Sequence, residues 1–309
     1  MDVRRTEPNV SEHALIVGRY SFQSYLRFVR TKRVEGNTLD ERMLAQEWRE
    51  IQQNVAEVEA AEKGAADNPH FVPLPDEMIP IAEEARQHEA IQRSFGIRAH
   101  QWWLVEIDRA IVFQPWVDLT FVREFQAGLP QPLSHEDHIR VSSGNFMTKP
   151  KVSAAQVSED RYVFTSPSTD VRFLGASLLD PSAIQGHHPR GYATHVVAVF
   201  LGSGVNCLSA LHVNNRLILL NGTHRAYALR DLGFTHVACL VTHIANDEEK
   251  NQMLPAAVKQ DEARFLGAAR PPLFKDYFNP AVRKIVPTVT TNTLLRLKLK
   301  QVKESVPSQ

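Results

Sequence analysis

The sequence predicts an α+β protein with a mainly helical N-terminal region, residues 1–150, and a core with a C-terminal extension, residues 151–309. Three observations predict this class. A helical apolar stripe covers residues 40–61, strand-like runs begin near Arg161, and a hairpin, a helix and a strand follow one another up to Val241. The change from helical to strand periodicity places the boundary near residue 150 and a small mixed sheet in about residues 161–241.

Composition and charge are those of a globular protein and not of a disordered, fibrous or membrane-spanning one. The chain has 309 residues, of which 43% are hydrophobic and 23% charged, a balance typical of globular proteins. Its 35 basic and 35 acidic residues give a formal net charge of zero, so a global electrostatic attraction to nucleic acid or membrane is absent. No apolar run reaches the roughly 18 residues of a membrane helix. With two cysteines, Cys207 and Cys239, and no signal-like N-terminus, we expect a soluble cytoplasmic protein with reduced thiols.

The N-terminal region is predicted to consist mainly of charged amphipathic helices. Residues 1–33 have seven basic and three acidic residues, a net charge of +4, and enough apolar residues for an ordered helix. A second helix, Asp40–Ala61, has one apolar stripe, and residues 40–63 carry a net charge of −4. Opposite charges favour pairing of the two helices as a hairpin, and a protein partner or nucleic acid remains the alternative contact.

The remaining elements follow from strand, turn and helix signals. We expect helices at Pro80–Ser94, Thr223–Leu232 (ended by Gly233) and Glu248–Leu266. We expect a strand or a buried turn at Trp102–Ile107. We expect strands at Arg161–Thr165, Val171–Leu174, His195–Leu201 (buried), Val237–Val241 and Leu295–Leu299 (half-buried). Leu211–Leu220 has the pattern of a hairpin that turns at Asn214-Asn215.

A candidate anion site lies where the strand Arg216–Leu220 runs through Asn221 and Gly222 into a helix. The first amide groups of a helix lack partners within the helix, and the helix dipole adds partial positive charge there. Gly222 allows close approach of a phosphate to the backbone, His224 adds a donor, and Arg225 offers a two-pronged fork. The alternative is that this segment binds no anion and is an ordinary helix start, in which Thr223 is the N-cap and Arg225 is a surface residue.

This segment resembles the ParB and sulfiredoxin superfamily. Members have a strand, a Gly-x-His-Arg or Gly-x-Arg-Arg element that opens a helix, a Leu-Gly turn and a valine-rich strand. The matching parts here are Leu217–Leu220, Gly222-Thr223-His224-Arg225, Leu232-Gly233 and Val237–Val241. The close match covers about 30 residues, and a looser similarity covers roughly 90.

The resemblance implies a ParB/sulfiredoxin-like fold that binds a nucleoside triphosphate, ATP or CTP, with Mg²⁺. It implies that His224 and Arg225 contact the nucleotide phosphates, together with Asn221, Gly222 and Thr223 of the same turn. In the loop 187–192, Arg190 is either a further phosphate contact or a solvated residue.

This chain departs from the family pattern in its acidic and nucleophilic groups. Thr223 stands where sulfiredoxins have a catalytic cysteine and ParB proteins a glutamate, and Asn221 stands where many relatives have aspartate. Repair of sulfinic acids is therefore not expected. A carboxylate for Mg²⁺ would have to come from elsewhere, with Asp170, Asp180 and Asp231 as candidates.

Three functions remain open at this point. The first is an enzyme that hydrolyses a nucleoside triphosphate or transfers its phosphoryl group. The second is a non-catalytic nucleotide- or partner-binding module whose N-terminal helices dock a protein. The third is a DNA-binding partition or nuclease-like protein, for which we predict weak binding because the charge is balanced and no helix-turn-helix follows the core. Its basic residues would be Arg283, Lys284, Arg296, Lys298, Lys300 and Lys303.

A metal site is not predicted. His135 and His138 have the i, i+3 spacing that can share a metal on a helix, but no third ligand is spaced to complete a site.

Overall fold

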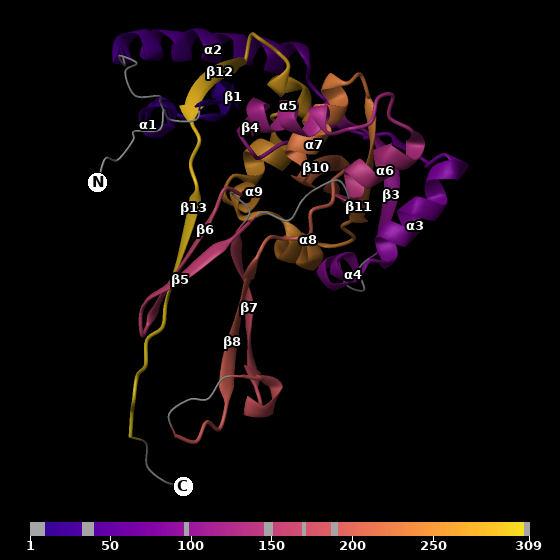
Figure 1. Ribbon diagram of the computed structural model, residues 1–309. Helices are drawn as coiled ribbons and strands as arrows, with labels where there is room; N and C mark the ends of the chain where they lie inside the picture. Colours follow the sequence, from indigo (N-terminus) through magenta and orange to yellow (C-terminus); the bar gives the residue numbers. More distant parts are fainter. Residues whose placement is uncertain are drawn as a thin grey trace. The chain divides into compact units, whose positions relative to one another are not determined.

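The computed structural model describes residues 10–32, 40–95, 99–144, 151–168, 171–186 and 191–305 (Figure 1). The chain forms two compact units, and each is described by itself. Unit 1 comprises residues 1–147 and 206–290, and unit 2 comprises residues 148–205 and 291–309. This division differs from the boundary predicted near residue 150, because residues 206–290 belong with the N-terminal part of the chain.

The main sheet of unit 1 has five strands in the order β10-β9-β11-β3-β2. Their bounds are Arg216–Asn221, Ser209–Val213, His236–His243, His100–Glu106 and Phe71–Val72. Strands β9 and β11 run parallel and the other neighbours antiparallel, so the sheet is mixed. Leu217 and Leu219 belong to one hydrophobic cluster and Ile218 to another, because alternate residues of a strand face opposite sides of the sheet.

The turn and the helix next to this sheet confirm the local predictions. The predicted hairpin forms from β9 and β10, with both Asn214 and Asn215 at positive φ (48° and 59°), which asparagine tolerates in tight turns. Helix α7, Thr223–Asp231, follows β10 and is succeeded by Gly233 at φ +97°.

A second sheet of unit 1 corrects the prediction for the N-terminus. Residues Val10–Ile16 form strand β1 rather than part of a helix. It lies between β12, Arg283–Val289, and β4, Trp116–Asp118, and it is antiparallel to both. Pairing with strands more than 100 residues away decides this conformation, and local propensity cannot reveal it.

Helices α1 and α2, Phe22–Lys32 and Glu41–Ala61, pack against each other and against this second sheet. The Asp40 side chain caps α2 by accepting hydrogen bonds from the amides of Arg42 and Met43, which confirms the predicted start of that helix. An ion pair joins Lys284 of β12 to Glu47 of α2.

Two predicted helices are interrupted. The first divides into α3 and α4, Ile79–Gln87 and Glu89–Phe95. The second divides at Pro255 into α8 and α9, Asp247–Met253 and Ala256–Gln260, and a π-helical turn, Ala263–Gly267, follows.

The other helices are α5, Leu119–Ala127, and α6, His135–Ser143. Short 3₁₀ turns lie at Val17–Arg19, Asp76–Met78, Ile107–Arg109, Pro181–Ala183 and Phe274–Tyr277.

Unit 2 contains two small sheets. One consists of β13-β6-β5, with bounds Thr293–Lys298, Arg161–Ser166 and Ser153–Ser158. The other is a two-stranded ribbon of β7, Arg172–Leu179, and β8, Val196–Gly202. The expectation of a buried strand at residues 195–201 is wrong, because β8 is half-buried to exposed along its length. The mixed α and β class is confirmed, but strands β6 to β8 do not join the main sheet.

Both cysteines are free thiols in the interior of unit 1. Among the described residues, no helix combines the length and the apolar character needed to cross a membrane.

Candidate functional site

The turn between β10 and α7 is held by contacts within the protein. Gly222 has φ +88°, and a Cβ atom at this position would lie 2.9 Å from the Cα atom of Leu208. The amide of Gly222 donates a hydrogen bond to Oδ1 of Asn221 (2.7 Å). Glycine is therefore required here by its dihedral angles and by the neighbouring Leu208, and Oδ1 of Asn221 fixes the turn.

The first turn of α7 presents three amide groups. The first hydrogen bond of the helix runs from the amide of Ala226 to the carbonyl of Gly222 (2.8 Å), so the amides of Thr223, His224 and Arg225 precede it. No oxygen in the described part of the chain accepts a hydrogen bond from these three groups. They lie at the positive end of the helix dipole, where Thr223 and Arg225 are buried and His224 is half-buried.

His224 is held in one tautomer by the backbone of β4. Its Nε2 atom accepts a hydrogen bond from the amide of Asp118 (3.0 Å), so the ring proton of the neutral imidazole must sit on Nδ1. Burial lowers the pKa of His224 to about 4, and the nearby Asp118 carboxylate opposes this shift only in part. Phe121 packs edge-on against the ring with centroids 5.4 Å apart. At neutral pH, Nδ1–H is a donor with no acceptor among the described residues.

Asp118 is a carboxylate that no sequence motif connects with this site. Its Oδ1 atom accepts hydrogen bonds from the Ser11 hydroxyl (2.6 Å) and from the amides of Thr120 (2.9 Å) and Phe121 (3.1 Å), and it thereby caps α5. Within the described ranges, no donor contacts Oδ2. The sequence shows a capping residue before a helix, but nothing in it relates Asp118 to His224, 106 positions later.

Arg225 does not offer its side chain to a ligand. The guanidinium is 2% exposed, and it donates hydrogen bonds to the carbonyls of Val141 and Ser142 (both 2.9 Å) and to Oδ1 of Asn206 (2.8 Å). Both carbonyls belong to the last turn of α6, so Arg225 caps the negative end of that helix. The expectation of an exposed fork at an open helix start is wrong.

The charge of Arg225 is nevertheless part of the site. Burial lowers the pKa of Arg225 to about 10, so the side chain stays protonated at neutral pH. Among the described residues, no carboxylate pairs with it, and its three acceptors are neutral. An unpaired cation under the first turn of α7 adds to the positive potential of the helix N-terminus.

The other candidate residues lie at the far end of α7, in unit 2 or outside the described residues. Arg190 and Asp170 are outside the described ranges. Asp180 belongs to unit 2, where its carboxylate binds Ser182. Asp231 lies at the far end of α7, about 12 Å along the helix axis, and accepts a hydrogen bond from Gln126. Within unit 1, Asp231 therefore supplies no carboxylate near the first turn of α7.

The paired histidines of α6 have different partners. His135 is exposed and contacts Glu77 (2.7 Å), whereas Nε2 of buried His138 accepts a hydrogen bond from the amide of Ala238 (3.2 Å). In the described ranges, no three His, Cys, Asp or Glu side chains are grouped closely enough to hold a metal ion by themselves.

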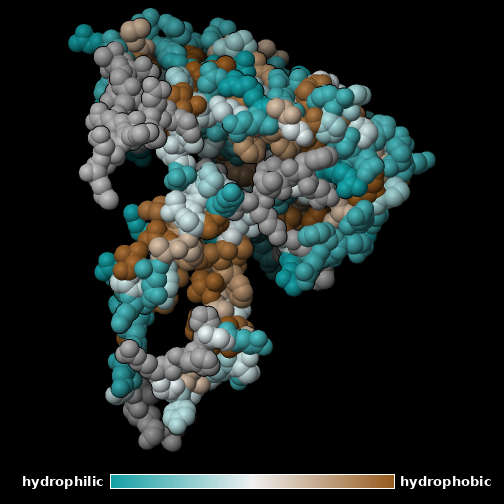
Figure 2. All heavy atoms as spheres, in the orientation of Figure 1, coloured by the Kyte–Doolittle hydropathy of each residue, from teal (hydrophilic) through white to brown (hydrophobic). Residues whose placement is uncertain are grey.

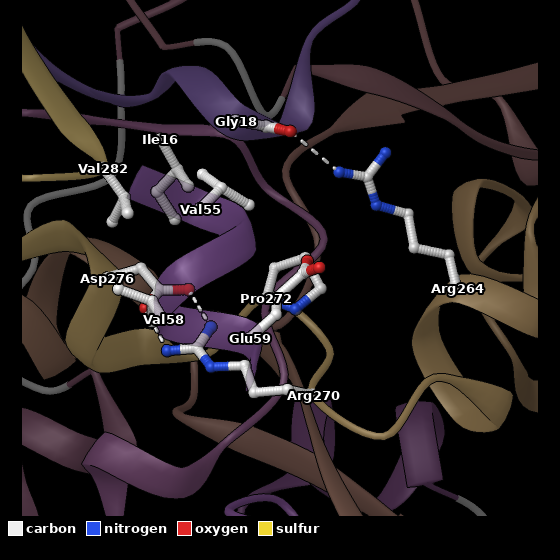
Figure 3. Close-up of a pocket in the computed structure, with 10 residues that line it drawn as sticks. All are labelled: Ile16, Gly18, Val55, Val58, Glu59, Arg264, Arg270, Pro272, Asp276 and Val282. Atoms are coloured by element: carbon white, nitrogen blue, oxygen red, sulfur yellow. Dashed lines mark hydrogen bonds and ion pairs between the residues drawn. The ribbon is translucent and has the colours of Figure 1, made fainter. Parts of the chain in front are cut away.

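The charged side chains that line a small pocket elsewhere in unit 1 are engaged within the protein (Figure 3). Arg270 on its wall is paired with Asp276, and Arg264 donates a hydrogen bond to the carbonyl of Gly18 (3.0 Å). The guanidinium of Arg270 also reaches Glu62, so its charge is neutralised within the protein. This arrangement stabilises the contact of α2 with residues 264–282 and is not a second anion site.

Comparisons of this chain with protein-family models, curated proteins and solved structures find no match.

Proposed function

We propose that this protein binds the phosphate groups of a nucleotide at the N-terminus of α7. The observation behind the proposal is the set of four donors in the first turn of that helix: the amides of Thr223, His224 and Arg225, and Nδ1–H of His224. All four donors are neutral groups, and none of them is paired with a carboxylate in the described part of the chain. They can therefore surround an anion. Helix N-termini with such donors are common phosphate sites.

The side chain of Arg225 supports the proposal through its charge and not through contact with the phosphates. Burial of the guanidinium without a carboxylate partner lowers the stability of the protein in the absence of a ligand. An anion bound over the first turn of α7 would offset part of this loss. The role proposed for Arg225 therefore differs from the direct phosphate contact expected from the sequence.

Mg²⁺ fits as a companion of the phosphates. This cation usually binds one or two protein carboxylates and takes its other ligands from phosphates and water. Asp118 has one carboxylate oxygen engaged in capping α5, and no donor in the described part of the chain contacts the other oxygen. Asp118 is the residue that would hold Mg²⁺ here, and hydrolysis or transfer of a bound phosphoryl group would need the charge neutralisation that Mg²⁺ supplies.

The similarity of Gly222-Thr223-His224-Arg225 to the ParB and sulfiredoxin superfamily gives the class of ligand, a nucleoside triphosphate such as ATP or CTP. The DNA-binding alternative has less support. Arg283 donates to the carbonyl of Tyr277 and Lys284 is paired with Glu47 in unit 1, while the other four basic residues considered belong to unit 2.

Two substitutions of His224 distinguish its contribution to nucleotide affinity from its contribution to protein stability. In His224→Gln the side-chain oxygen can still accept the amide of Asp118, but the donor at the Nδ1 position is lost. We expect unchanged stability and about tenfold to hundredfold weaker nucleotide binding, because a hydrogen bond to a charged group contributes about 1.5–3 kcal/mol. In His224→Asn the amide nitrogen can replace Nδ1–H while the acceptor for Asp118 is lost, so affinity should be kept and stability reduced.

The measurement is calorimetric titration of both variants and the wild type with ATP, CTP and GTP, each with and without Mg²⁺, alongside urea unfolding. His135→Gln, an exposed position on α6, is the matched control and should leave both affinity and stability unchanged. If the wild type binds none of the nucleotides, or if His224→Gln binds as tightly as the wild type, the proposed site is wrong.

A further inference from the structure

Two histidines of the main sheet in unit 1 face each other on neighbouring parallel strands. His212 of β9 and His243 of β11 are register partners, so their side chains leave the same face of the sheet near the ends of both strands. Their Nδ1 atoms are 3.0 Å apart, and the ring planes meet at 83° with centroids 5.0 Å apart. The two rings therefore meet at their Nδ1 atoms and do not stack.

The ring of Phe71 packs against both imidazoles, with its centroid 5.0 Å from that of His212 and 5.6 Å from that of His243. Because it contacts both rings, it helps to hold them in this orientation. His212 is half-buried and His243 is exposed, so solvent reaches the pair from the side of His243. Among the described residues, no other side chain forms a hydrogen bond or an ion pair with either ring.

The two facing nitrogen atoms share one proton. A neutral imidazole has one N–H group and one lone pair, so at 3.0 Å one Nδ1 atom donates a hydrogen bond and the other accepts it. The Nε2 atom of His212 is buried and has no hydrogen-bond partner, so neither tautomer of His212 satisfies both of its nitrogen atoms. Another cation can therefore replace the shared proton without breaking a further hydrogen bond of His212.

We propose that His212 and His243 bind one transition-metal ion, Cu²⁺ or Zn²⁺, between their Nδ1 atoms. Metal–nitrogen bonds of about 2.0–2.1 Å place neighbouring ligand nitrogens about 2.9 Å apart on a square-planar ion and about 3.3 Å apart on a tetrahedral one. The 3.0 Å between the two Nδ1 atoms lies between these values. The pairing of β9 with β11 thus already holds both ligands at the distance that one ion requires.

Metal binding changes a tautomer but causes no net loss of a proton. The ring that carries its proton on Nδ1 releases it and takes one up on Nε2, so that both Nδ1 lone pairs face the ion. In the described ranges, no third His, Cys, Asp or Glu joins the pair, so water completes the coordination, as in metal sites that keep open positions.

This site is separate from the proposed phosphate site. The turn that starts α7 lies beside Ser209, three residues, or about 10 Å, along β9 from His212. The two sites also differ in the cation that they favour. Mg²⁺ prefers oxygen ligands, whereas imidazole nitrogen favours Cu²⁺ and Zn²⁺. Metal binding by the histidine pair therefore requires no nucleotide.

Long-range ¹H–¹⁵N NMR spectra of the histidine rings in the full chain test the proposal, recorded at about pH 7.5 with and without Zn²⁺. Without metal, one of the two Nδ1 atoms should carry a proton. With Zn²⁺, both rings should carry their proton on Nε2, and both Nδ1 signals should shift. Unchanged tautomers of His212 and His243 at saturating Zn²⁺ would overturn the proposal.

Calorimetric titration without nucleotide measures the affinity and its order among metals. Affinity should rise from Mn²⁺ through Co²⁺ and Ni²⁺ to Cu²⁺, with Zn²⁺ below Cu²⁺, and Mg²⁺ should not bind to the pair. His212→Gln and His243→Gln each remove one of the two imidazole ligands. Each should weaken Cu²⁺ binding by about tenfold or more.

A control is needed because surface groups also bind metal ions weakly. Hydrophilic side chains cover much of the surface around α2 and α3 in Figure 2. His135→Gln, at an exposed position on α6, is the matched control and should leave the Cu²⁺ affinity unchanged. If neither His212→Gln nor His243→Gln binds Cu²⁺ more weakly than this control, the proposed metal site is wrong.

Discussion

Replacing Arg225 with alanine should lower the free energy of unfolding of unit 1 by about 3 kcal/mol. The change removes three hydrogen bonds from a charged donor, to the carbonyls of Val141 and Ser142 and to the amide oxygen of Asn206. The two carbonyls keep backbone donors, the amides of Gly144 (3.2 Å) and Leu208 (2.7 Å). A hydrogen bond to a charged group contributes about 1.5–3 kcal/mol. Relief from burying an unpaired charge offsets part of this loss, which is why the expected effect is smaller than the sum.

The contact that Arg225 makes is also difficult to replace. Gly144, at φ +84°, follows α6 with its Cα so close to the backbone of Asn206 that a Cβ atom would lie 2.0 Å from the Asn206 carbonyl oxygen. Residues 141–144 and 206 therefore cannot easily move together to fill the space of the guanidinium. Arg225→Lys should recover only part of the loss, because one ammonium cannot reach three acceptors in the geometry of a planar fork.

Urea unfolding of Arg225→Ala, followed by tryptophan fluorescence, measures this effect. Arg123→Ala is the matched control, because Arg123 is an exposed arginine of α5 that contacts Glu12, and its loss should change stability by less than about 0.5 kcal/mol. A variant at position 225 as stable as the wild type would mean that the guanidinium does not cap α6.

Acidification from pH 6.5 towards pH 4 should destabilise the fold by about 3 kcal/mol through His138 alone. This side chain is 4% exposed, its Nε2 atom accepts the amide hydrogen of Ala238, and burial lowers its pKa to about 4. Between the folded value and the unfolded value near 6.5, the unfolded chain binds a proton that the folded chain excludes. Stability is therefore highest above pH 6.5 and falls as the pH decreases. His224 has a pKa lowered in the same direction and steepens the dependence.

His138→Gln isolates this contribution. Glutamine can still accept the amide hydrogen of Ala238 through its side-chain oxygen, but it does not titrate. Between pH 7.5 and pH 5 the variant should lose about 2 kcal/mol less stability than the wild type. His70→Gln, at an exposed position, is the control. Equal pH dependence of wild type and His138→Gln would contradict a neutral, buried His138.

The elements that the sequence predicted correctly are those decided by local chemistry. The asparagine pair at 214 and 215 sets the turn between β9 and β10, Asp40 caps α2, and Gly233 ends α7. The elements predicted wrongly depend on distant partners. Strand β1 forms because β12 pairs with it from residue 283 onward, and no local pattern in residues 10–16 reveals that partner.

The candidate site shows the same limit. The strand, the glycine and the helix start could be predicted, because they follow one another in the sequence. The direction of the Arg225 side chain could not, because α7 is buried around most of its circumference and its sequence has no polar face to orient it. The link between His224 and Asp118 depends on the packing of β4 beside α7, which no spacing in the sequence encodes.

The most direct test of phosphate binding is an NMR titration of the labelled wild type with ATP and CTP in the presence of Mg²⁺. Saturable shifts should appear for the amides of Thr223, His224 and Arg225 and for Nδ1 of His224, which should keep its proton throughout. Shifts confined to other parts of the chain, or none at these four nitrogens under saturating nucleotide, would contradict a phosphate site at the N-terminus of α7.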